Sequence, residues 1–332
     1  MYDWAEFRHF LYLLTILEKG GLRLAAEQLN TSQPNLSVQA RQFQEYAGVR
    51  LFRKTKDGRI QPTETGLAFI GLARQVIEVR DEAIEAIIAI ERGDIDSIRL
   101  GCSPLADPDL FRRLCAMHKE LLPSCTVRPT HADPVHLREG ILDGEIDAAI
   151  VTLPFKHPSL RVEGLRSDRL VVCLRKDSPL AEKAALSTAD LQDNLAIVYH
   201  PQKHPDAHVR LMELLDDVGV EVREHSSASH PTEMQMLVKE GYGLALIREG
   251  ATLDDELTTR RIVGVQWTVD TAIAFHRQSH PKTIPVLVRK LRKSMQQEPD
   301  SLPLQTQSSY PRTPRPLRSN KNDDPRQLPL LG

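Results

Sequence analysis

The sequence predicts an α plus α/β chain: an all-helical N-terminal region that ends in a short β-hairpin, one long helix, and an α/β region in two halves. Three observations predict this. Apolar residues recur at helical spacing through roughly the first 90 residues. Asp57-Gly58, a strong hairpin signal, lies between two short extended pieces. After residue 95, apolar strands alternate with helices.

Length and composition limit the class of protein. The 332 residues are enough for two or three domains, and 41% of them are hydrophobic. No apolar run approaches the roughly 18 residues of a membrane span, and the N-terminus lacks the basic and apolar segments of a signal peptide. We therefore expect a cytoplasmic protein with no membrane partner. Four cysteines without Cys-x-x-Cys spacing are expected to be small buried apolar residues.

The charge is distributed unevenly. The whole chain has a formal net charge of -2, but residues 1–66 hold nine Lys and Arg against seven Asp and Glu. Within them, residues 50–59 contain five basic side chains and a single acid, Asp57. A local basic cluster bears more on nucleic-acid binding than the charge of the whole chain does.

The first helices end at glycines and begin at capping residues. A helix from Phe7 is stopped by Gly20-Gly21, and a short one covers 22–29. Ser32 can cap a third helix, whose first turn tolerates Pro34 because the missing N–H would have no partner there. Three helices followed by a basic hairpin form a winged helix-turn-helix.

One long helix is predicted from Glu64 to about residue 90. Its apolar residues form one stripe, interrupted at Arg80-Asp81. The stripe consists of Leu67, Ile70, Ala73, Ile77, Ile84, Ile87 and Ile88. Because the sequence offers no neighbouring domain to bury a helix of this length, we expect a partner chain to cover the stripe.

The remaining chain repeats one pattern twice. Strands are predicted at 97–102, 126–130, 148–152, 170–174, 195–199, 220–225, 244–247 and 271–276. Helices are predicted at 111–122, 134–142, 207–218, 233–240 and 284–295. Two halves of this kind imply two α/β subdomains with a cleft between them.

These elements divide the chain into four parts. They are 1–63, the winged helix-turn-helix; 64–93, the linker and dimerisation helix; 94–297, the α/β domain; and 298–332, a tail rich in Pro, Ser, Asn and Arg that we expect to be disordered. Within the α/β domain, subdomain one comprises 97–168 plus 269–295, and subdomain two comprises 169–268.

Four N-terminal segments agree in order and spacing with one family. They are LAAEQL at 24–29, SQPNLS at 32–37, GVRLFRK at 48–54 and TETG at 63–66. Together they resemble the LysR-type transcriptional regulators, and GEIDAAI at 144–150 and EGYGLAL at 240–246 resemble two segments of that family's sensor domain. Gly21 stands where the family usually has Ser, Val38 where it often has Arg, and the long tail is not a family feature.

The resemblance implies a function and an assembly. It implies a sequence-specific DNA-binding regulator whose activity is modulated by a small molecule, bound in a cleft of a type II periplasmic-binding-protein-like sensor domain. It also implies antiparallel pairing of two linker helices, with higher assembly through the sensor domains, so a homodimer or homotetramer. The effector, the operator and the sign of regulation stay open.

Ten residues are candidates for contacts with double-stranded DNA. A recognition helix enters the major groove with its N-terminal residues toward the base edges, and Gln or Asn can read adenine there. On this helix the candidates are Ser32, Gln33, Asn35, Ser37, Gln39 and Arg41, the last two being better placed for phosphates. On the wing they are Arg53, Lys54, Lys56 and Arg59. The alternative is that Ser32 and Asn35 only cap the helix and that the basic hairpin is only solvated.

Five residues are candidates for the effector site. In α/β folds of this kind, ligands lie at the carboxyl ends of strands and near helix N-termini. Polar residues at the ends of predicted strands are Ser103, Thr152 and His200, and Ser229 and His230 precede the helix predicted at 233–240. Helix N-termini favour negative charge, which makes an organic anion the preferred effector. Each residue could instead be an ordinary cap or loop residue.

Other chemistries find little support. His200, His204 and His208 have a spacing that suits a metal, but Pro201 and Pro205 interrupt the helix that this spacing needs. No motif of a hydrolase, phosphate-binding loop or metalloprotease occurs, so we expect no catalytic residues, no metal and no cofactor. Two alternatives remain: an enzyme on the same cleft fold with an appended helix-turn-helix, and a solute-binding module.

Overall fold

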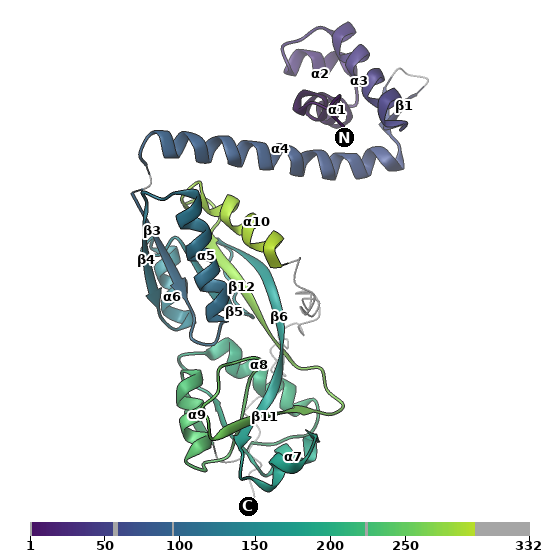
Figure 1. Ribbon diagram of the computed structural model, residues 1–332. Helices are drawn as coiled ribbons and strands as arrows, with labels where there is room; N and C mark the ends of the chain where they lie inside the picture. Colours follow the sequence, from purple (N-terminus) through teal and green to yellow (C-terminus); the bar gives the residue numbers. More distant parts are fainter. Residues whose placement is uncertain (1, 56–58, 95, 223–224, 296–332) are drawn as a thin grey trace, which may run out of the picture.

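The structure is a computed structural model that describes residues 2–55, 59–94, 96–222 and 225–295. The wing residue Lys56 and the expected tail at 298–332 lie outside the described residues. Three parts follow one another in space: a small helical domain, a long helix that lies across the molecule, and an elongated α/β domain (Figure 1).

The N-terminal domain has the predicted helices and hairpin. They are α1 (Phe7–Lys19), α2 (Leu22–Gln28), α3 (Gln33–Ala47), β1 (Phe52–Lys54) and β2 (Ile60–Pro62). Ser32 caps α3 by accepting a hydrogen bond from the Asn35 N–H at 3.3 Å. Gly20 and Gly48 end α1 and α3 with φ angles of 63° and 65°, a backbone region that favours glycine.

The start of the long helix is locked onto the hairpin. Helix α4 (Glu64–Glu91) begins after Thr63, whose hydroxyl accepts from the Gly66 N–H at 3.0 Å and donates to the Arg50 carbonyl at 2.6 Å. A Cβ added to Gly66 would lie 1.9 Å from the Leu51 carbonyl oxygen. Only glycine therefore allows helix and hairpin to approach this closely.

The two halves of α4 have different surroundings, which corrects the single stripe that the sequence predicts. In the first half, Phe69 and Ala73 are buried in the core of the N-terminal domain, and Ile70 and Ile77 pack against it. Both are half-buried, so their own domain covers only part of each side chain, and their contact with a partner chain stays a prediction. Large apolar side chains left exposed on α4 are Leu67, Leu72, Val79, Ile84, Ile87, Ile88 and Ile90.

The α/β domain is built on strands in the order β4-β3-β5-β12-β6-β10-β8-β9. In the part nearer α4, β3 (Ser97–Cys102) lies parallel to β4 (Thr126–His131) and β5 (Ala148–Thr152). Strand β12 (Thr268–His276) pairs antiparallel with β5 and β6 (Leu160–Arg175). Helices α5 (Pro108–Leu121), α6 (Pro134–Leu142) and α10 (Ile284–Met295) belong to this part.

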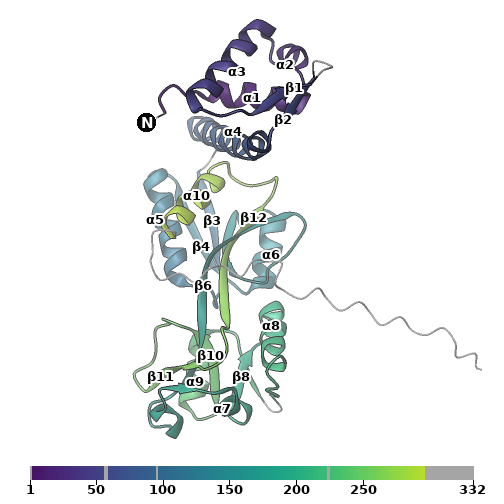
Figure 2. The same ribbon diagram turned by 90° about the vertical axis from the view of Figure 1, so that its right-hand side faces the viewer.

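The part farther from α4 uses the second half of β6. There β6 pairs with β10 (Leu244–Arg248) and β11 (Leu257–Ile262). The remaining strands of this part are β7 (Ala185–Leu186), β8 (Leu195–Tyr199) and β9 (Ser226–Ala228). Its helices are α7 (Thr188–Gln192), α8 (Pro205–Asp216) and α9 (Pro231–Lys239), with a 3-10 turn at Pro179–Glu182. Strands β6 and β12 run side by side between the two parts (Figure 2).

Three strand predictions need correction. The strand predicted at 170–174 is only the last third of β6, which has 16 residues. The strand predicted at 220–225 lies later, at β9, while 220–222 and 225 are not in a strand and 223–224 lie outside the described residues. Strand β11 has no counterpart in the prediction, because its sequence LTTRRI lacks an apolar pattern.

Candidate DNA-binding surface and ligand cavity

Helix α3 presents a polar face to solvent. Leu36, Ala40 and Phe43 are buried in the core, which fixes the rotation of the helix. The opposite side exposes Ser32, Gln33, Asn35, Ser37 and Arg41. Most of the predicted reading residues therefore lie together on one accessible surface at the start of α3.

Gln39 differs from the other candidates on this helix. It is half-buried, and its Oε1 lies 2.8 Å from Nε2 of His9 on α1. The carboxamide is thus turned toward the protein and joins α3 to α1. His9 Nδ1 also accepts from the Glu6 N–H at 2.9 Å, so the imidazole donates from Nε2 to Gln39.

The wing exposes several cations to solvent. Arg53 and Lys54 on β1 and Arg59 just before β2 are exposed. Among the residues that the structure describes, none forms an ion pair with these three. Arg41, Arg50 and Arg53 line one shallow groove between α3 and the wing. Arg50 was not among the predicted contact residues, although its place in the basic cluster of 50–59 was a signal for it.

A cavity of about 350 Å³ lies between the two parts of the α/β domain. One wall is the loop after β3, residues 103–107, with the start of α5. The other wall is the start of α9 with the end of β10 and the loop that follows. Apolar side chains make up much of the lining, among them Leu105, Tyr199, Met234, Ile247 and Val269.

Ser103 is the polar group best placed for a ligand. Its side chain lines the cavity, the residue is only 1% exposed, and its Oγ has no hydrogen-bond partner. Its backbone is fixed, because its N–H donates to the Ile150 carbonyl at 2.9 Å. A buried hydroxyl without a partner costs about 1–3 kcal/mol, which a ligand with a complementary group could recover.

The other four predicted residues are divided between the cavity and the scaffold. His230 lines the cavity. Thr152, His200 and Ser229 are not among its lining residues. Thr152 is buried in β5 opposite Thr271 of β12, and His200 accepts from the Gln202 N–H at 3.2 Å in the turn before α8.

Ser229 and the three histidines serve local structure. The Ser229 N–H donates to Glu233 Oε2 at 2.7 Å, and its carbonyl accepts from His204 Nε2 at 2.8 Å. His204 lies just before Pro205, where α8 begins, so His200 and His208 are not on one continuous helix with it. Among the described residues no group of three or more His, Cys, Asp or Glu is placed to hold a metal.

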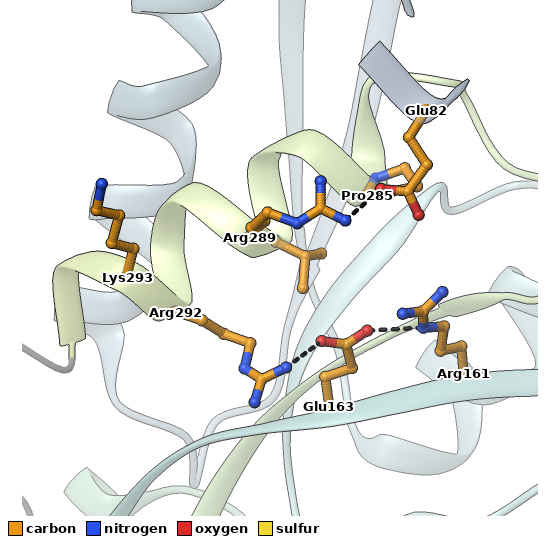
Figure 3. Close-up of a pocket in the computed structure, with 8 residues that line it drawn as sticks. Glu82, Arg161, Glu163, Pro285, Arg289, Arg292 and Lys293 are labelled. Carbon is orange, nitrogen blue, oxygen red and sulfur yellow. Dashed lines mark hydrogen bonds and ion pairs between the residues drawn. The ribbon is translucent and has the colours of Figure 1, made fainter. Parts of the chain in front are cut away.

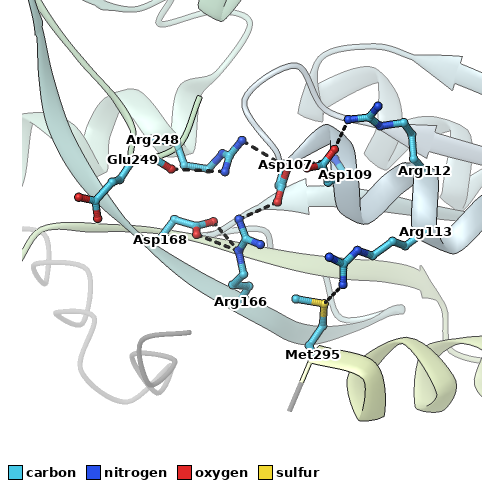
Figure 4. Close-up of polar contacts among 9 residues, drawn as sticks. All are labelled: Asp107, Asp109, Arg112, Arg113, Arg166, Asp168, Arg248, Glu249 and Met295. Atoms are coloured by element: carbon cyan, nitrogen blue, oxygen red, sulfur yellow. Dashed lines mark hydrogen bonds and ion pairs between the residues drawn. The ribbon is translucent and has the colours of Figure 1, made fainter. Parts of the chain in front are cut away.

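A buried ionic network joins the two parts of the domain beside the cavity (Figure 4). Asp107, before α5, lies 2.7 Å from the Arg166 guanidinium and 3.3 Å from that of Arg248 at the end of β10. Arg166 also pairs with Asp168 at 2.8 Å. Burial raises the pKa of Asp168, while the Arg166 cation acts in the opposite direction. No local sequence pattern predicts this network, because Asp107, Arg166 and Arg248 are far apart along the chain.

Helix N-termini at the cavity are already occupied by carboxylates of the chain. At α5, Asp107 Oδ1 accepts from the Asp109 N–H at 3.0 Å. At α9, Glu233 Oε2 accepts from the N–H groups of Ser229 and His230, and the Ser229 bond is the main cause that lowers the Glu233 pKa. A carboxylate of the chain therefore already lies at or beside the N-terminus of each of these two helices.

The thiols at the cavity and in the sheets are unreactive in character. Burial raises the pKa of Cys102, which lines the cavity, and that of Cys173 to about 12. Burial also raises the pKa values of Cys115 and Cys125. None of the described helices is both long and apolar enough to cross a membrane.

The linker helix is attached to the α/β domain by charges. Glu82 of α4 pairs with Arg289 of α10 at 2.5 Å, and Glu85 pairs with Lys282 at 2.9 Å. Beneath them, Glu163 bridges Arg161 at 2.7 Å and Arg292 at 2.9 Å (Figure 3). The Glu82–Arg289 pair and the Glu163 pairs line a hollow between α4 and α10. A change of angle between α4 and the domain must break or rearrange the pairs of Glu82 and Glu85.

Family models match nearly the whole described chain. Residues 7–67 match the model described as the bacterial regulatory helix-turn-helix protein, lysR family. Residues 91–296 match the LysR substrate binding domain. Both matches fall where the structure has the helical N-terminal domain and the α/β domain.

Relatives and solved structures agree with these matches. The HTH-type transcriptional regulator AlsR of Bacillus subtilis (strain 168) is 26% identical over 280 residues, which are 83% of this chain and 91% of AlsR. BudR of Raoultella terrigena, also an HTH-type transcriptional regulator, is 25% identical over 84% of this chain and 97% of its own length. Full-length CbnR in complex with its target DNA has the same fold, with a TM-score of 0.52, 22% identity, and coverage of 88% of this chain and 100% of CbnR. Full-length BenM gives a TM-score of 0.54 at 21% identity, over 87% of this chain and 96% of BenM.

Proposed function

Because the chain belongs to the LysR family of bacterial DNA-binding transcriptional regulators with an effector-binding domain, we propose how its parts divide the work. Residues 1–63 read DNA, residues 64–93 join two subunits, and residues 94–297 sense the effector. Within the sensor, subdomain one is 97–168 plus 269–295, and subdomain two is 169–268. This division is supported by separate hydrophobic cores in the N-terminal domain, which includes the start of α4, and in each of the two sensor subdomains.

Helix α3 is the proposed reading element for double-stranded DNA. Its first turns place Ser32, Gln33, Asn35 and Ser37 at the base edges of the major groove. Arg41 on α3, with Arg53, Lys54 and Arg59 on the wing, lies near phosphates of the flanking backbone. The exposed polar face at the start of α3 carries this proposal. Gln39 has a different role, because its bond to His9 holds α3 against α1.

The exposed apolar face of α4 is the proposed dimer interface. Ile84 and Ile87 are 48% and 65% exposed, and Leu72 is 61% exposed. Burying one such side chain contributes roughly 1.5–3 kcal/mol, so a second copy of α4 is a suitable cover. Pairing two reading heads then lets one molecule bind two half-sites, as a dimer or as a pair of dimers.

The cavity beside Ser103 is the proposed effector site. It lies between the two sensor subdomains, and the Asp107, Arg166 and Arg248 network crosses between them at its edge. A ligand there contacts both subdomains and so favours one relative arrangement of them. We propose no catalytic step, because no base lies within hydrogen-bond distance of the Ser103 hydroxyl. Since its target is DNA, we place the protein in the bacterial cytoplasm.

Footprinting with the full-length protein tests the DNA-reading function. We expect protection of two half-sites upstream of its own gene or a neighbouring gene, separated by whole helical turns. A triple variant, Gln33→Ala, Asn35→Ala and Ser37→Ala, should lose this footprint while keeping its fold, since all three side chains are exposed. Gln42→Ala is the matched control, an exposed glutamine farther along α3. A footprint that survives the triple variant but not the control would contradict reading by this face.

A further inference from the structure

We propose that the effector is an uncharged, mainly apolar molecule with a single hydrogen-bonding group that pairs with Ser103. This inference rests on the proposed effector site and specifies the chemical class that it accepts. Three independent features carry it: the balance of charges around the cavity, the occupied helix N-termini, and the position of the one unpartnered polar atom.

The charged residues that line the cavity cancel one another. Asp107 pairs with Arg248, and Asp109 pairs with Arg112 at the rim (Figure 4). Arg166, which is not in the lining, pairs with Asp107 from behind. The four charged lining residues are therefore two acids and two bases, each with a partner inside the protein. Neither an anion nor a cation finds an opposite charge there without displacing an existing pair.

The helix N-termini at the cavity do not replace a cation in binding an anionic ligand. A helix N-terminus can hold an anion because its first N–H groups lack partners inside the helix. At α5 the Asp107 carboxylate accepts from the Asp109 N–H, and at α9 the Glu233 carboxylate lies beside the helix start, where it accepts from the N–H groups of Ser229 and His230. A carboxylate ligand would meet a like charge at both ends, and a buried carboxylate without a partner is strongly disfavoured.

The remaining lining specifies an apolar body with one polar group. Leu105, Met234, Ile247 and Val269 supply apolar contact on several sides of the cavity. Against them lies the Ser103 hydroxyl, buried and without a partner, which can donate to a carbonyl or accept from a hydroxyl or amide. One polar group on the ligand can therefore satisfy the buried Ser103 hydroxyl, which has no hydrogen-bond partner among the described residues. His131 and His230 also belong to the lining.

The test compares pairs of molecules that differ only in charge. The probes are benzamide with benzoate, cyclohexanecarboxamide with cyclohexanecarboxylate, and hexanamide with hexanoate. Each is added to the full-length protein at about pH 8, and binding is followed by the thermal midpoint and by calorimetry. For such small molecules we expect dissociation constants in the millimolar range. At least one amide should bind tenfold or more tightly than its carboxylate, a difference of about 1.4 kcal/mol.

Two variants show whether the binding is in the cavity and depends on charge. Ser103→Ala should abolish the response to the amides, whereas Thr283→Val, which alters another buried and unpartnered hydroxyl outside the cavity, should not. Asp109→Asn removes the partner of Arg112 at the rim and should allow the carboxylates to bind.

The possible results separate the two proposals. Carboxylates that bind the unaltered protein in a Ser103-dependent way, and more tightly than their amides, overturn the uncharged class while leaving the effector site in place. If no probe of either kind stabilises the protein through Ser103, the cavity itself is rejected as the effector site. Amides that bind equally well to Ser103→Ala reject the assignment of the hydrogen bond.

Discussion

The proposed DNA-binding surface and the proposed effector cavity of this regulator differ in whether their charged side chains are paired. On the DNA-facing side, Arg53, Lys54 and Arg59 stand in solvent with no ion pair among the described residues. In the cavity, Asp107 and Arg248 are almost fully enclosed and paired with each other. The difference teaches where each kind of binding free energy comes from. Binding to DNA depends on releasing counterions from phosphates, whereas binding in the cavity depends on burial and shape.

Solvent exposure accounts for this contrast. An exposed guanidinium stays hydrated, so an unpaired cation on the wing costs little until DNA arrives. Beside the cavity, the side chains of Asp107 and Arg248 are 2% and 13% exposed, and burial of an unpaired charge would cost several kcal/mol. The ionic network is therefore the condition under which charged residues can lie there at all.

The largest expected effect is a difference in salt dependence between the two surfaces. Raising salt from about 50 to 200 mM should weaken DNA binding by roughly 10³- to 10⁵-fold if the dimer makes some 6–10 phosphate contacts. Over the same range, binding of an amide probe in the cavity should change by less than about twofold, since screening acts on charges. Fluorescence anisotropy with labelled upstream DNA and calorimetry with the amide measure the two responses on one protein sample.

Either half of this experiment could break the comparison. An affinity for DNA that hardly changes with salt would mean that the wing and α3 cations do not meet phosphates. An affinity for the amide that falls steeply with salt would mean that an unbalanced charge lies in the cavity. A DNA fragment of unrelated sequence serves as the control, because phosphate contacts should give it a similar slope.

The sequence predicts the proposed DNA-binding surface better than it predicts the cavity. The proposed reading residues of α3 lie in one contiguous segment, so capping by Ser32 and termination at Gly48 are enough to place them on a single helix. Gln39 was the exception, because its partner His9 lies 30 residues away on another helix. No pattern within α3 distinguishes a side chain that faces solvent from one that reaches α1.

The cavity could be predicted only in outline. Polar residues at strand ends and before helices indicated Ser103 and His230, but the same rule indicated Thr152, which lies inside the sheet opposite Thr271. Strands β6 and β12 pass between the two parts of the domain, and this determines which strand ends lie together. The first half of β6 has too little apolar pattern for the length of the strand to be predicted from the sequence. Asp107 and Arg248 are 141 positions apart, so their pairing follows from the tertiary fold alone.

The next largest effect concerns the proposed dimer. Dimerisation places two DNA-binding surfaces in one molecule, whereas each cavity binds its ligand independently. Ile84→Glu with Ile87→Glu places two charges on the exposed apolar face of α4 and should separate the subunits. Loss of the second reading head should weaken binding to a two-half-site operator by roughly 10²- to 10⁴-fold. Sedimentation measures the first effect and anisotropy the second.

The dimer experiment has a matched control and a clear contrary result. Gln75→Glu adds a charge to an exposed polar position of the same helix and should leave the subunits paired. Amide binding in the cavity should be unchanged in both variants, because the cavity lies within one subunit. A double variant that sediments as a dimer and binds the operator tightly would show that other surfaces hold the subunits together.

The smallest expected effect distinguishes base recognition from phosphate contacts within the proposed DNA-binding surface. Gln33→Ala removes an exposed carboxamide from the first turn of α3 and should lose roughly 1–3 kcal/mol of discrimination between the operator and its mismatched variants. Lys54→Ala on the wing should instead weaken binding to all sequences alike and reduce the salt slope by about 0.9, the value for one phosphate contact. Competition titrations at two salt concentrations measure both quantities. If Gln33→Ala weakens binding to the operator and to its mismatched variants alike, the carboxamide contacts the backbone rather than a base, and the reading must come from Asn35 and Ser37 beside it.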